Sequence, residues 1–402
     1  MSIEPPTGPL AGIRVLDMTS IGMGPMATQM LGDMGADVVK VESADGDIFR
    51  HVTPQRNPGM SHAFLNLNRN KRSVVLDAKT AHGREAIARL CAGADVFVSN
   101  VRPDALRRLG LDYETLSRDH PRLVYCGCYG YSEHGPYAGR ASLDDVIQAA
   151  CGMAWFQGVG AEQPRFVNTA AVDKVCGLYI SNAIAMALYA RERTGRGQAI
   201  EVPMFETMVA FMSPEHLGGR TFVPSDGPAG YSRILNPWRK PYRSLDGYLS
   251  VVPYTDAQWR RFFRCAGRTD LLDDPRFLTQ NERSRHFPEL YGQVEAIVAT
   301  RSNADWIATL RDEDIPYAPV NSIDDLIGDP HLAACGFWHE VDHASEGRLR
   351  MAGIPIRFSG TPGSIRRLAP RLGEHTDEVL REVGIEPQPG IEPQPVDRRR
   401  VP

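Results

Sequence analysis

The sequence predicts an α/β protein, in which a parallel sheet with crossover helices is followed by a smaller α-rich unit. Apolar runs of four to six residues alternate with amphipathic stretches over the first hundred residues, which is the pattern of strands joined by helices. A chain of 402 residues exceeds the usual size of one domain. Hydrophobic residues make up 42% and charged residues 23% of the chain, as is typical of a soluble α/β enzyme.

The larger unit is predicted from its apolar runs and the amphipathic stretches between them. We expect strands at 14–18 (RVLDM), 37–42 (DVVKVE), 73–77 (SVVLD), 95–100 (DVFVSN), 123–130 (LVYCGCYG) and 198–204 (QAIEVPM). We expect helices at 25–34, 80–91 and 173–193. The stretch from 213 to about 243 is rich in Gly, Pro and Arg and predicts a functional loop or a crossing between domains. A strand at 248–252 and helices near 256–266, 288–299 and 303–312 then form the smaller unit.

Composition excludes several kinds of protein. The net charge of −4 gives no overall attraction to nucleic acid or to an anionic membrane. The seven cysteines form no CxxC pair and no zinc-ligand spacing, so we expect reduced thiols and no metal. The N-terminus lacks the pattern of a signal peptide, and no window approaches the roughly 20 apolar residues of a membrane span. We therefore expect a cytoplasmic protein without a membrane partner.

A glycine-rich turn follows the first expected strand. Gly22, Gly24 and Ala27 have the GxGxxA spacing of a dinucleotide-binding turn, and Glu42 is the acid that would hold a ribose. Three residues separate the strand from the first glycine, whereas a dinucleotide turn follows its strand tightly. An NAD-dependent oxidoreductase therefore stays an alternative, behind plain turn geometry or a different anionic ligand.

Two basic stretches flank expected strands, NLNRNKRS (66–73) and NVRPDALRRLG (100–110). Charged stretches of this kind usually lie in loops that are exposed to solvent. Arg and Lys near the carboxyl end of a strand can also bind phosphate. We favour a polyanionic ligand.

Asp173 stands at the head of a long run of small and apolar residues, VDKVCGLYISNAIAMALYARERTGRGQ. Asp is a preferred N-cap, and the following residues form a helical apolar face that ends at Gly195. Position alone thus favours a cap. A carboxylate at a helix start is also rigidly held and can serve as a nucleophile. No HxxxH, HxxE or GxSxG pattern offers a metal hydrolase or a serine hydrolase instead.

Seven motifs follow one another with nearly regular spacing from about residue 9 to 383. They are LAGIRVLDMT, GADVVKVE, NRNKRSVVLD, DVFVSNVRPDALRRLGLDYETL, HGPYAGR, VDKVCGLYISNAIAMALYARERTGRGQAIEVPMFE and LGEHTDEVL. In this order they resemble the class III coenzyme A transferases, the family that includes formyl-CoA transferase and the carnitine CoA-transferases. The resemblance covers nearly the whole chain.

The resemblance implies an interlocked homodimer in which a Rossmann-like large domain is completed by the C-terminal segment. We accordingly divide the chain into the first part of the large domain (1–212), a linker (213–245), a small domain (246–330), a return segment (331–383) and a Pro-rich tail expected to be disordered (384–402). The implied activity moves coenzyme A from an acyl-CoA donor to a carboxylic acid, through an aspartyl-CoA thioester and without a metal or redox cofactor.

The resemblance also implies the site residues. The catalytic aspartate would be Asp173, and the family's CoA-binding segments fall on Gly22, Met23, Asn68, Lys71, Arg72, Asn100, Arg102 and Arg108. Backbone N–H groups of glycine loops such as CGCYG would stabilise the charged adducts.

Some positions depart from formyl-CoA transferase. This chain has Gly22 where that enzyme has a glutamine, Ser43 where it has a CoA-contacting arginine, and no run of four glycines. A formyl or oxalate substrate is therefore not implied. The same fold hosts 2-methylacyl-CoA racemases, whose proton-transferring histidine corresponds to Leu143, and leucine cannot transfer a proton. Racemase is the alternative within the fold.

The acceptor acid is predicted less directly, from charge in the Gly- and Pro-rich stretch. Four arginines gather there, Arg220, Arg233, Arg239 and Arg243. They form either a solvated face or a partner for a second carboxylate. We therefore include a dicarboxylate among the possible acceptors.

Overall fold

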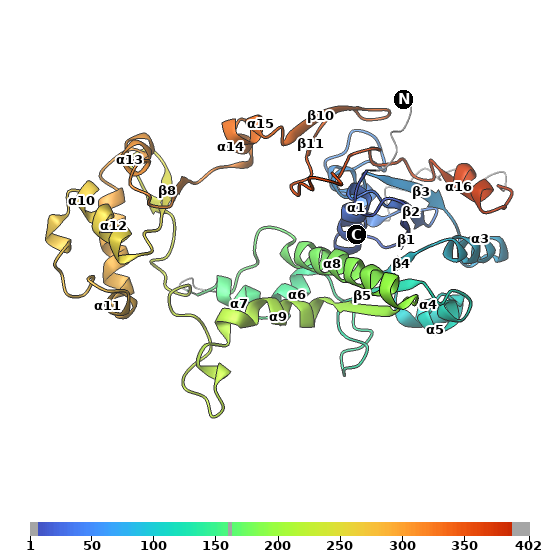
Figure 1. Cartoon of the computed structure of the whole chain (residues 1–402), viewed down its shortest axis with the longest axis horizontal. Helices are drawn as coiled ribbons and strands as arrows, with labels where there is room; N and C mark the ends of the chain where they lie inside the picture. The colour runs from blue at the N-terminus through green and yellow to red at the C-terminus, as the bar shows by residue number, and fades with distance from the viewer. Residues whose placement is uncertain (1–6, 160–162, 388–402) are drawn as a thin grey trace. The chain divides into compact units, whose positions relative to one another are not determined.

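The computed structural model describes residues 7–159 and 163–387, and Figure 1 shows the path of the chain. The chain divides into two compact units. Unit 1 comprises the described residues up to Met153, then Phe166–Phe211, and those from Cys335 onward; unit 2 comprises Ala154–Arg165 and Met212–Ala334. Most of the predicted tail, from residue 388, lies outside the described residues.

Unit 1 is built on one six-stranded sheet in which all neighbouring strands are parallel. The strand order is β3-β2-β1-β4-β5-β6. The strands are β1 (Arg14–Met18), β2 (Asp37–Glu42), β3 (Lys71–Val75), β4 (Val96–Ser99), β5 (Val124–Tyr129) and β6 (Ala199–Pro203). The order reverses between β1 and β4, and the crevice at the carboxyl ends of such neighbouring strands is where α/β sheets bind ligands.

Helices join the strands of unit 1, and a hairpin follows late in the chain. The helices are α1 (Met23–Asp33), α2 (His62–Leu67), α3 (Ala81–Ala92), α4 (Pro103–Leu109), α5 (Tyr113–Asp119), α6 (Asp144–Ala150), α8 (Ala171–Thr194) and α16 (Thr376–Glu382). The hairpin consists of β10 (Trp338–His343) and β11 (Gly347–Ala352), and it was not predicted. Two further helices, α7 (Met153–Gln157) and α9 (Met204–His216), cross the boundaries between the units.

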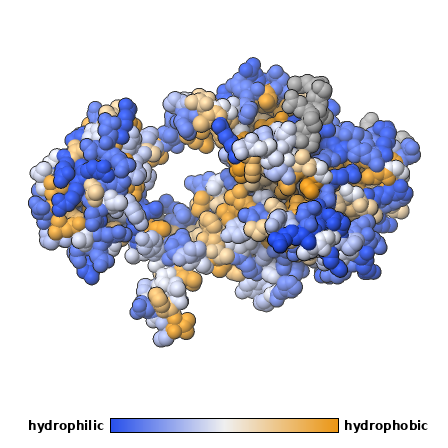
Figure 2. Space-filling view, viewed as in Figure 1, coloured by the Kyte–Doolittle hydropathy of each residue, from blue (hydrophilic) through white to orange (hydrophobic). Residues whose placement is uncertain are grey.

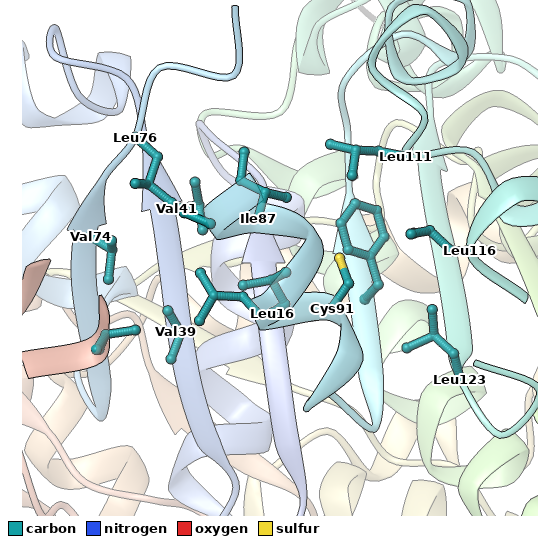
Figure 3. Close-up of a cluster of buried hydrophobic side chains, with 14 of the residues drawn as sticks. Leu16, Val39, Val41, Val74, Leu76, Ile87, Cys91, Leu111, Leu116 and Leu123 are labelled. Carbon is teal, nitrogen blue, oxygen red and sulfur yellow. The ribbon is translucent and has the colours of Figure 1, made fainter. Parts of the chain in front are cut away.

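One face of the sheet carries a hydrophobic core. Figure 3 shows Ile87 and Cys91 of α3 above Leu16, Val39 and side chains of the neighbouring strands. These side chains are almost completely buried. Burial of apolar area at about 25 cal/mol per Å² is the main stabilising contribution to such a layer.

The opposite side of the sheet is covered by α1 and α8, which pack along each other while α8 also contacts β5 and β6. Gly177 permits the close approach, since a Cβ there would lie 3.0 Å from the backbone oxygen of Met23. Helix α8 ends at Gly195 in a left-handed conformation, as predicted. Our expectation that no apolar window is long enough for a membrane span was wrong, because α8 meets that criterion by length and composition, although 44% of its most apolar window is buried in the protein.

The third strand begins two residues earlier than predicted. Lys71 and Arg72 were expected in a loop before the strand, but both lie in β3 and are buried. Their charges are paired, Lys71 with Asp17, and Arg72 with Asp37, Glu378 and Glu382. Buried charges of this kind are tolerated only with such partners.

The chain returns to unit 1 after residue 334, as the placement of Cys335 onward in that unit indicates. Asn70 anchors this segment with four hydrogen bonds: its N–H donates to Arg367 O, its side-chain amide to Ser364 O, and its Oδ1 accepts from the N–H groups of Arg366 and Arg367. Arg72 adds its ion pairs to α16.

Unit 2 is a small α-rich unit around a three-stranded antiparallel sheet, β7-β8-β9. Its core is aromatic and includes Trp259, Phe262 and Trp306. The strands are β7 (Tyr242–Arg243), β8 (Tyr248–Val251) and β9 (Tyr317–Pro319), and the helices are α10 (Asp256–Cys265), α11 (Gln280–Arg285), α12 (Phe287–Val298), α13 (Asn303–Leu310), α14 (Ile323–Ile327) and α15 (Pro330–Ala334).

Candidate active site

A pocket of about 430 Å³ opens at the carboxyl ends of β1 and β4, where the strand order reverses. All its lining residues belong to unit 1. Its walls are formed by the loop 20–23, by Asn100, Arg102 and Pro103, by the segments 128–131 and 139–143, and by Glu133, Val146, Asp173 and Met204. The position is the one expected for a ligand site in a doubly wound sheet.

The loop after β1 has a strained backbone. Ile21 has φ +73°, a left-handed conformation that costs a β-branched residue on the order of 1–3 kcal/mol. Its N–H donates to Asp47 Oδ1 at 3.0 Å. Beside it, Ser20 N–H donates to Asn100 Oδ1 at 3.1 Å and Asn100 Nδ2 donates to Ser20 O at 2.9 Å. These three hydrogen bonds hold the loop in place.

Buried ion pairs support the same loop from below. Lys40 Nζ donates to Asp47 Oδ2 at 2.9 Å and to Thr19 O at 2.7 Å, and both charged side chains are fully buried. Burial alone would raise the pKa of Asp17, but the ammonium groups of Lys71 and Lys40 lower it to about 2. The loop thus rests on a set of fixed charges.

Asp173 lies in the first turn of α8, and its carboxylate lines the pocket. The helix begins at Ala171 with Ala170 as N-cap, so the interpretation of Asp173 as an N-cap was wrong. The carboxylate instead meets the loop after β1. The Met23 N–H acts to lower its pKa, and a Cβ on Gly22 would lie 2.7 Å from its Cγ, closer than ordinary contact.

The environment of Asp173 disfavours its charge. The residue is only 8% exposed. Burial, together with the negative charge of Asp144, raises the pKa of Asp173 to about 6, and the Met23 N–H only partly offsets this. A carboxyl with a pKa near neutrality in a pocket is a candidate catalytic group.

Asp144 is a neighbour of Asp173 that sequence reasoning missed. It stands at the start of α6, and its Oδ2 accepts the backbone N–H of Asp173 at 2.9 Å. Its Oδ1 accepts from Gln148. The acid pair in SLDDVIQAACG was the only signal, and that segment served only for the comparison of Leu143 with a racemase histidine.

Two guanidinium groups supply positive charge to the pocket. Arg102 is the N-cap of α4, and Arg140, which was not predicted, lies over the ring of Tyr137 at 4.0 Å. Within residues 7–159 and 163–387 neither has an ion pair with a carboxylate. Both are therefore able to bind an anion.

The predicted CoA-binding residues fall into two groups. Gly22, Met23, Asn100 and Arg102 line the pocket. Asn68, Lys71, Arg72 and Arg108 do not, and the first three of these are buried in contacts within the protein. Lys71 Nζ, for example, donates to Asp17, Pro25 O and Asn68 Oδ1. Arg108 is exposed in the last turn of α4.

The structure gives different roles to the residues behind the alternatives. Glu42, the expected ribose acid of a dinucleotide site, is buried and pairs with Arg50 at 2.7 Å while accepting from Ser73. Gly24 is a glycine because a Cβ would collide with Thr19. Leu143 lines the pocket with an exposed aliphatic side chain, which has no group that could donate or accept a proton.

The predicted oxyanion stretch CGCYG forms most of β5, which is paired on both sides, so most of its amides serve the sheet. The loop at Gly22 and Met23 is the better placed donor. Among the residues that the structure describes, no group of three His, Cys, Asp or Glu side chains is arranged to hold a metal ion.

A doubly wound sheet whose strand order reverses beside a buried carboxylate is typical of an α/β enzyme, and Asp173 is its candidate reactive group. The chain belongs to CoA-transferase family III, whose model matches residues 10–376. It is therefore a CoA-transferase that acts on CoA thioesters and carboxylic acids.

Known relatives and solved structures agree. A succinate–glutarate CoA-transferase from Agrobacterium fabrum is 33% identical over 93% of this chain and 96% of its own. A formyl-CoA:oxalate CoA-transferase from Escherichia coli O157:H7 is 32% identical over 94% and 96%. A CaiB/BaiF family protein from Brucella suis has a TM-score of 0.79 at 32% identity and covers 94% of this chain and 100% of its own. A hypothetical protein from Mycobacterium tuberculosis has a TM-score of 0.81 at 28% identity, with 93% and 100% covered.

Proposed function

We propose that the protein transfers coenzyme A from an acyl-CoA donor to a dicarboxylic acid, with the carboxylate of Asp173 as the nucleophile. The observation that carries this proposal is the position of the Asp173 carboxylate, which lines the pocket next to the loop after β1 and does not cap its own helix. A carboxylate that can be acylated conserves the energy of the thioester, first in an anhydride and then in an aspartyl-CoA thioester.

The first half of the reaction moves CoA onto the enzyme. An oxygen of Asp173 attacks the thioester carbonyl, the C–S bond breaks and CoA leaves as a thiolate, which produces a mixed anhydride. The thiolate then attacks the aspartyl carbonyl, the donor carboxylate leaves and an aspartyl-CoA thioester remains. The negative charge that forms on the aspartyl oxygen in this step develops beside the Met23 N–H.

The second half reverses these steps with the acceptor acid. Its carboxylate attacks the aspartyl thioester and displaces the CoA thiolate, which yields an anhydride between Asp173 and the acceptor. The thiolate attacks the acceptor carbonyl, forms the new acyl-CoA and restores the Asp173 carboxylate. The same N–H donor serves both halves, and no proton need be moved.

For the CoA thioester we infer contacts with Gly22, Met23, Asn100 and Arg102, and we add Arg140. The support is that these residues line one pocket with Asp173 and that both guanidinium groups lack an ion pair in the described part of the chain. Arg forms bidentate hydrogen bonds with phosphate, which suits the diphosphate of CoA.

A dicarboxylic acid as acceptor is supported by two observations. The relatives named above act, by their names, on succinate, glutarate and oxalate, which are all dicarboxylates. In this chain, two of the four arginines of the Gly- and Pro-rich stretch, Arg233 and Arg239, line one pocket of unit 2. A guanidinium is a good partner for a second carboxylate.

We also propose a cytoplasmic homodimer. Helix α8 exposes Leu178, Tyr179, Met186 and Tyr189 to between 46% and 65%, and Figure 2 shows hydrophobic surface in this region. Apolar surface of this kind typically marks an interface. Light scattering after gel filtration would give a mass near twice 44.4 kDa; a monomer at micromolar concentration would contradict the dimer.

The mechanism is tested by trapping. Enzyme incubated with the acyl-CoA donor and then with hydroxylamine or borohydride should carry a modification at Asp173, located by peptide mass spectrometry. Asp173→Ala should show neither modification nor transfer. An active Asp173→Ala variant, or a modification confined to another residue, would refute the mechanism.

A further inference from the structure

The loop after β1 is held by side chains that come from the neighbouring strand β2 and the segment after it. Asp47 Oδ1 accepts the N–H of Ile21 at 3.0 Å, and its Oδ2 accepts from Lys40 Nζ at 2.9 Å. Lys40 Nζ also donates to Thr19 O at 2.7 Å. The ion pair of Asp47 with Lys40 therefore contacts the loop at two points, on either side of Ser20.

Asp47 is itself rigidly placed. Its side chain is fully buried. Its backbone N–H donates to Glu42 Oε1 at 2.9 Å, and Glu42 is fixed by an ion pair with Arg50 at 2.7 Å. Its Oδ1 also accepts the N–H of Phe49, as the N-cap of the short 3-10 helix Ile48–His51. A buried carboxylate whose partners are all present is held in one place, so it can fix the position of the loop.

The loop needs such a partner because its backbone conformation is unfavourable. Ile21 has φ +73°, a left-handed conformation that β-branched residues rarely adopt. With this conformation the next residue, Gly22, lies directly against the Asp173 carboxylate, since a Cβ on Gly22 would lie 2.7 Å from Asp173 Cγ. The N–H of Met23 acts on the same carboxylate and lowers its pKa. If Ile21 relaxed to a negative φ, both backbone groups would move relative to Asp173.

We propose that Asp47 is a positioning residue for the transfer reaction, and that its hydrogen bond with Ile21 keeps the loop after β1 against the Asp173 carboxylate. This inference rests on the proposed function, in which Asp173 is acylated. Asp47 does not line the pocket, so it acts through the loop and not on the substrate. Loss of its hydrogen bond should slow the chemical step, because the Met23 N–H would no longer face the charge that develops on the aspartyl oxygen.

Two variants of the full-length enzyme separate positioning from stability. Both carry Lys40→Met, so that no buried lysine is left without its partner. One adds Asp47→Ala and the other Asp47→Asn, whose amide oxygen can still accept the Ile21 N–H. With succinyl-CoA as donor and glutarate as acceptor, the alanine variant should have a kcat about a hundredfold lower than the asparagine variant, the loss typical of a missing oxyanion donor. Asp45→Ala, which changes an exposed neighbour, is the control and should leave kcat unchanged.

The pH profile gives a readout that a merely structural role would not move. Burial and the charge of Asp144 raise the pKa of Asp173, and the Met23 N–H partly offsets them. In the alanine variant the offset is lost while both causes remain, so the acid limb of kcat/KM should move to higher pH. In the asparagine variant it should stay in place. Equal kcat values in the two variants, or acid limbs at the same pH, would overturn the proposal.

A further measurement does not depend on turnover. Hydrogen exchange, read by peptide mass spectrometry, should be faster for the peptide that contains Ile21 in the alanine variant than in the asparagine variant. Equal exchange in the two variants would overturn the proposal even in an active enzyme. Conversely, faster exchange in the alanine variant of an enzyme in which Asp173 cannot be trapped would refute the proposed function, while it would confirm that Asp47 holds the loop.

Discussion

Replacement of Asp144 by asparagine provides the sharpest test of how the pocket prepares Asp173. The nucleophile must be ionised, and the pKa of Asp173 is raised to about 6 by burial and by the charge of Asp144. At pH 5 a carboxyl of this pKa is ionised in roughly a tenth of the molecules, so kcat/KM should fall about tenfold from its plateau at pH 7. In Asp144→Asn the amide oxygen of the new side chain can still accept the Asp173 N–H, while the charge is gone.

The acid limb of the pH profile is therefore expected to move to lower pH in Asp144→Asn. It should stay above the ordinary carboxyl value of 3.8, because burial, the larger cause, remains. The assay is kcat/KM for the acyl-CoA donor from pH 4.5 to 8 at constant ionic strength, since this ratio reports the free enzyme. Asp145→Asn, an exposed neighbour on the same helix, is the control. A limb that is already near pH 4 in the unmodified enzyme, or that stays at pH 6 in Asp144→Asn, would refute the reasoning.

Four further substitutions test other parts of the site. The pKa of Asp173 in the folded protein exceeds the ordinary value of 3.8, so the protonated carboxyl stabilises the fold below pH 3.8 and this stabilisation is lost as the pH rises through about 6. Asp173→Asn should therefore raise the free energy of unfolding at pH 7 by up to about 3 kcal/mol. Urea denaturation at pH 7 and at pH 3.5 would measure this, with no gain expected at pH 3.5. Lys71→Met should destabilise the fold by about 3–5 kcal/mol, because it leaves Asp17 buried without its partner. Arg102→Gln should instead raise the KM for acyl-CoA without a change in stability. A Lys71→Met variant that keeps its stability but has a raised KM for acyl-CoA would show that Lys71 binds the ligand. Gly177→Ala should force α1 away from α8, lower the melting temperature and reduce kcat, and an unchanged kcat would show that the position of the loop after β1 does not depend on this contact.

The sheet of unit 1 could be predicted because its signals are local. The strands β1 and β2 have the predicted bounds, since short apolar runs between breakers leave few alternatives. Strand β3 was misplaced because Lys71 and Arg72 look like loop residues until their partners are known. Those partners, such as Asp17 and Glu382, are 54 and 310 residues away, so no local pattern reveals that these charges are paired and buried.

The site was predictable only in part for the same reason. Asp173 was singled out by family resemblance, while its local pattern favoured an N-cap. Asp144 and Arg140 carry no local signal, because their proximity to Asp173 and to the pocket arises from tertiary structure. Of the four arginines singled out in the Gly- and Pro-rich stretch, Arg233 and Arg239 line the pocket in unit 2, whereas Arg220 and Arg243 do not. The sequence could not separate them, because only the fold decides which side chains face the pocket.

The position of Asp173 within α8 bears directly on its chemistry. An aspartate at the N-cap would accept hydrogen bonds from its own helix, which would lower its pKa and weaken it as a nucleophile. Here the helix starts at Ala171 and its N-cap, Ala170, has no side-chain bond, while the backbone N–H of Asp173 is taken by Asp144. The Asp173 carboxylate is thereby left to the loop at Gly22 and Met23. A neighbouring helix supplies the cap, so the carboxylate of Asp173 is not used by its own helix, which is what the proposed nucleophilic role requires.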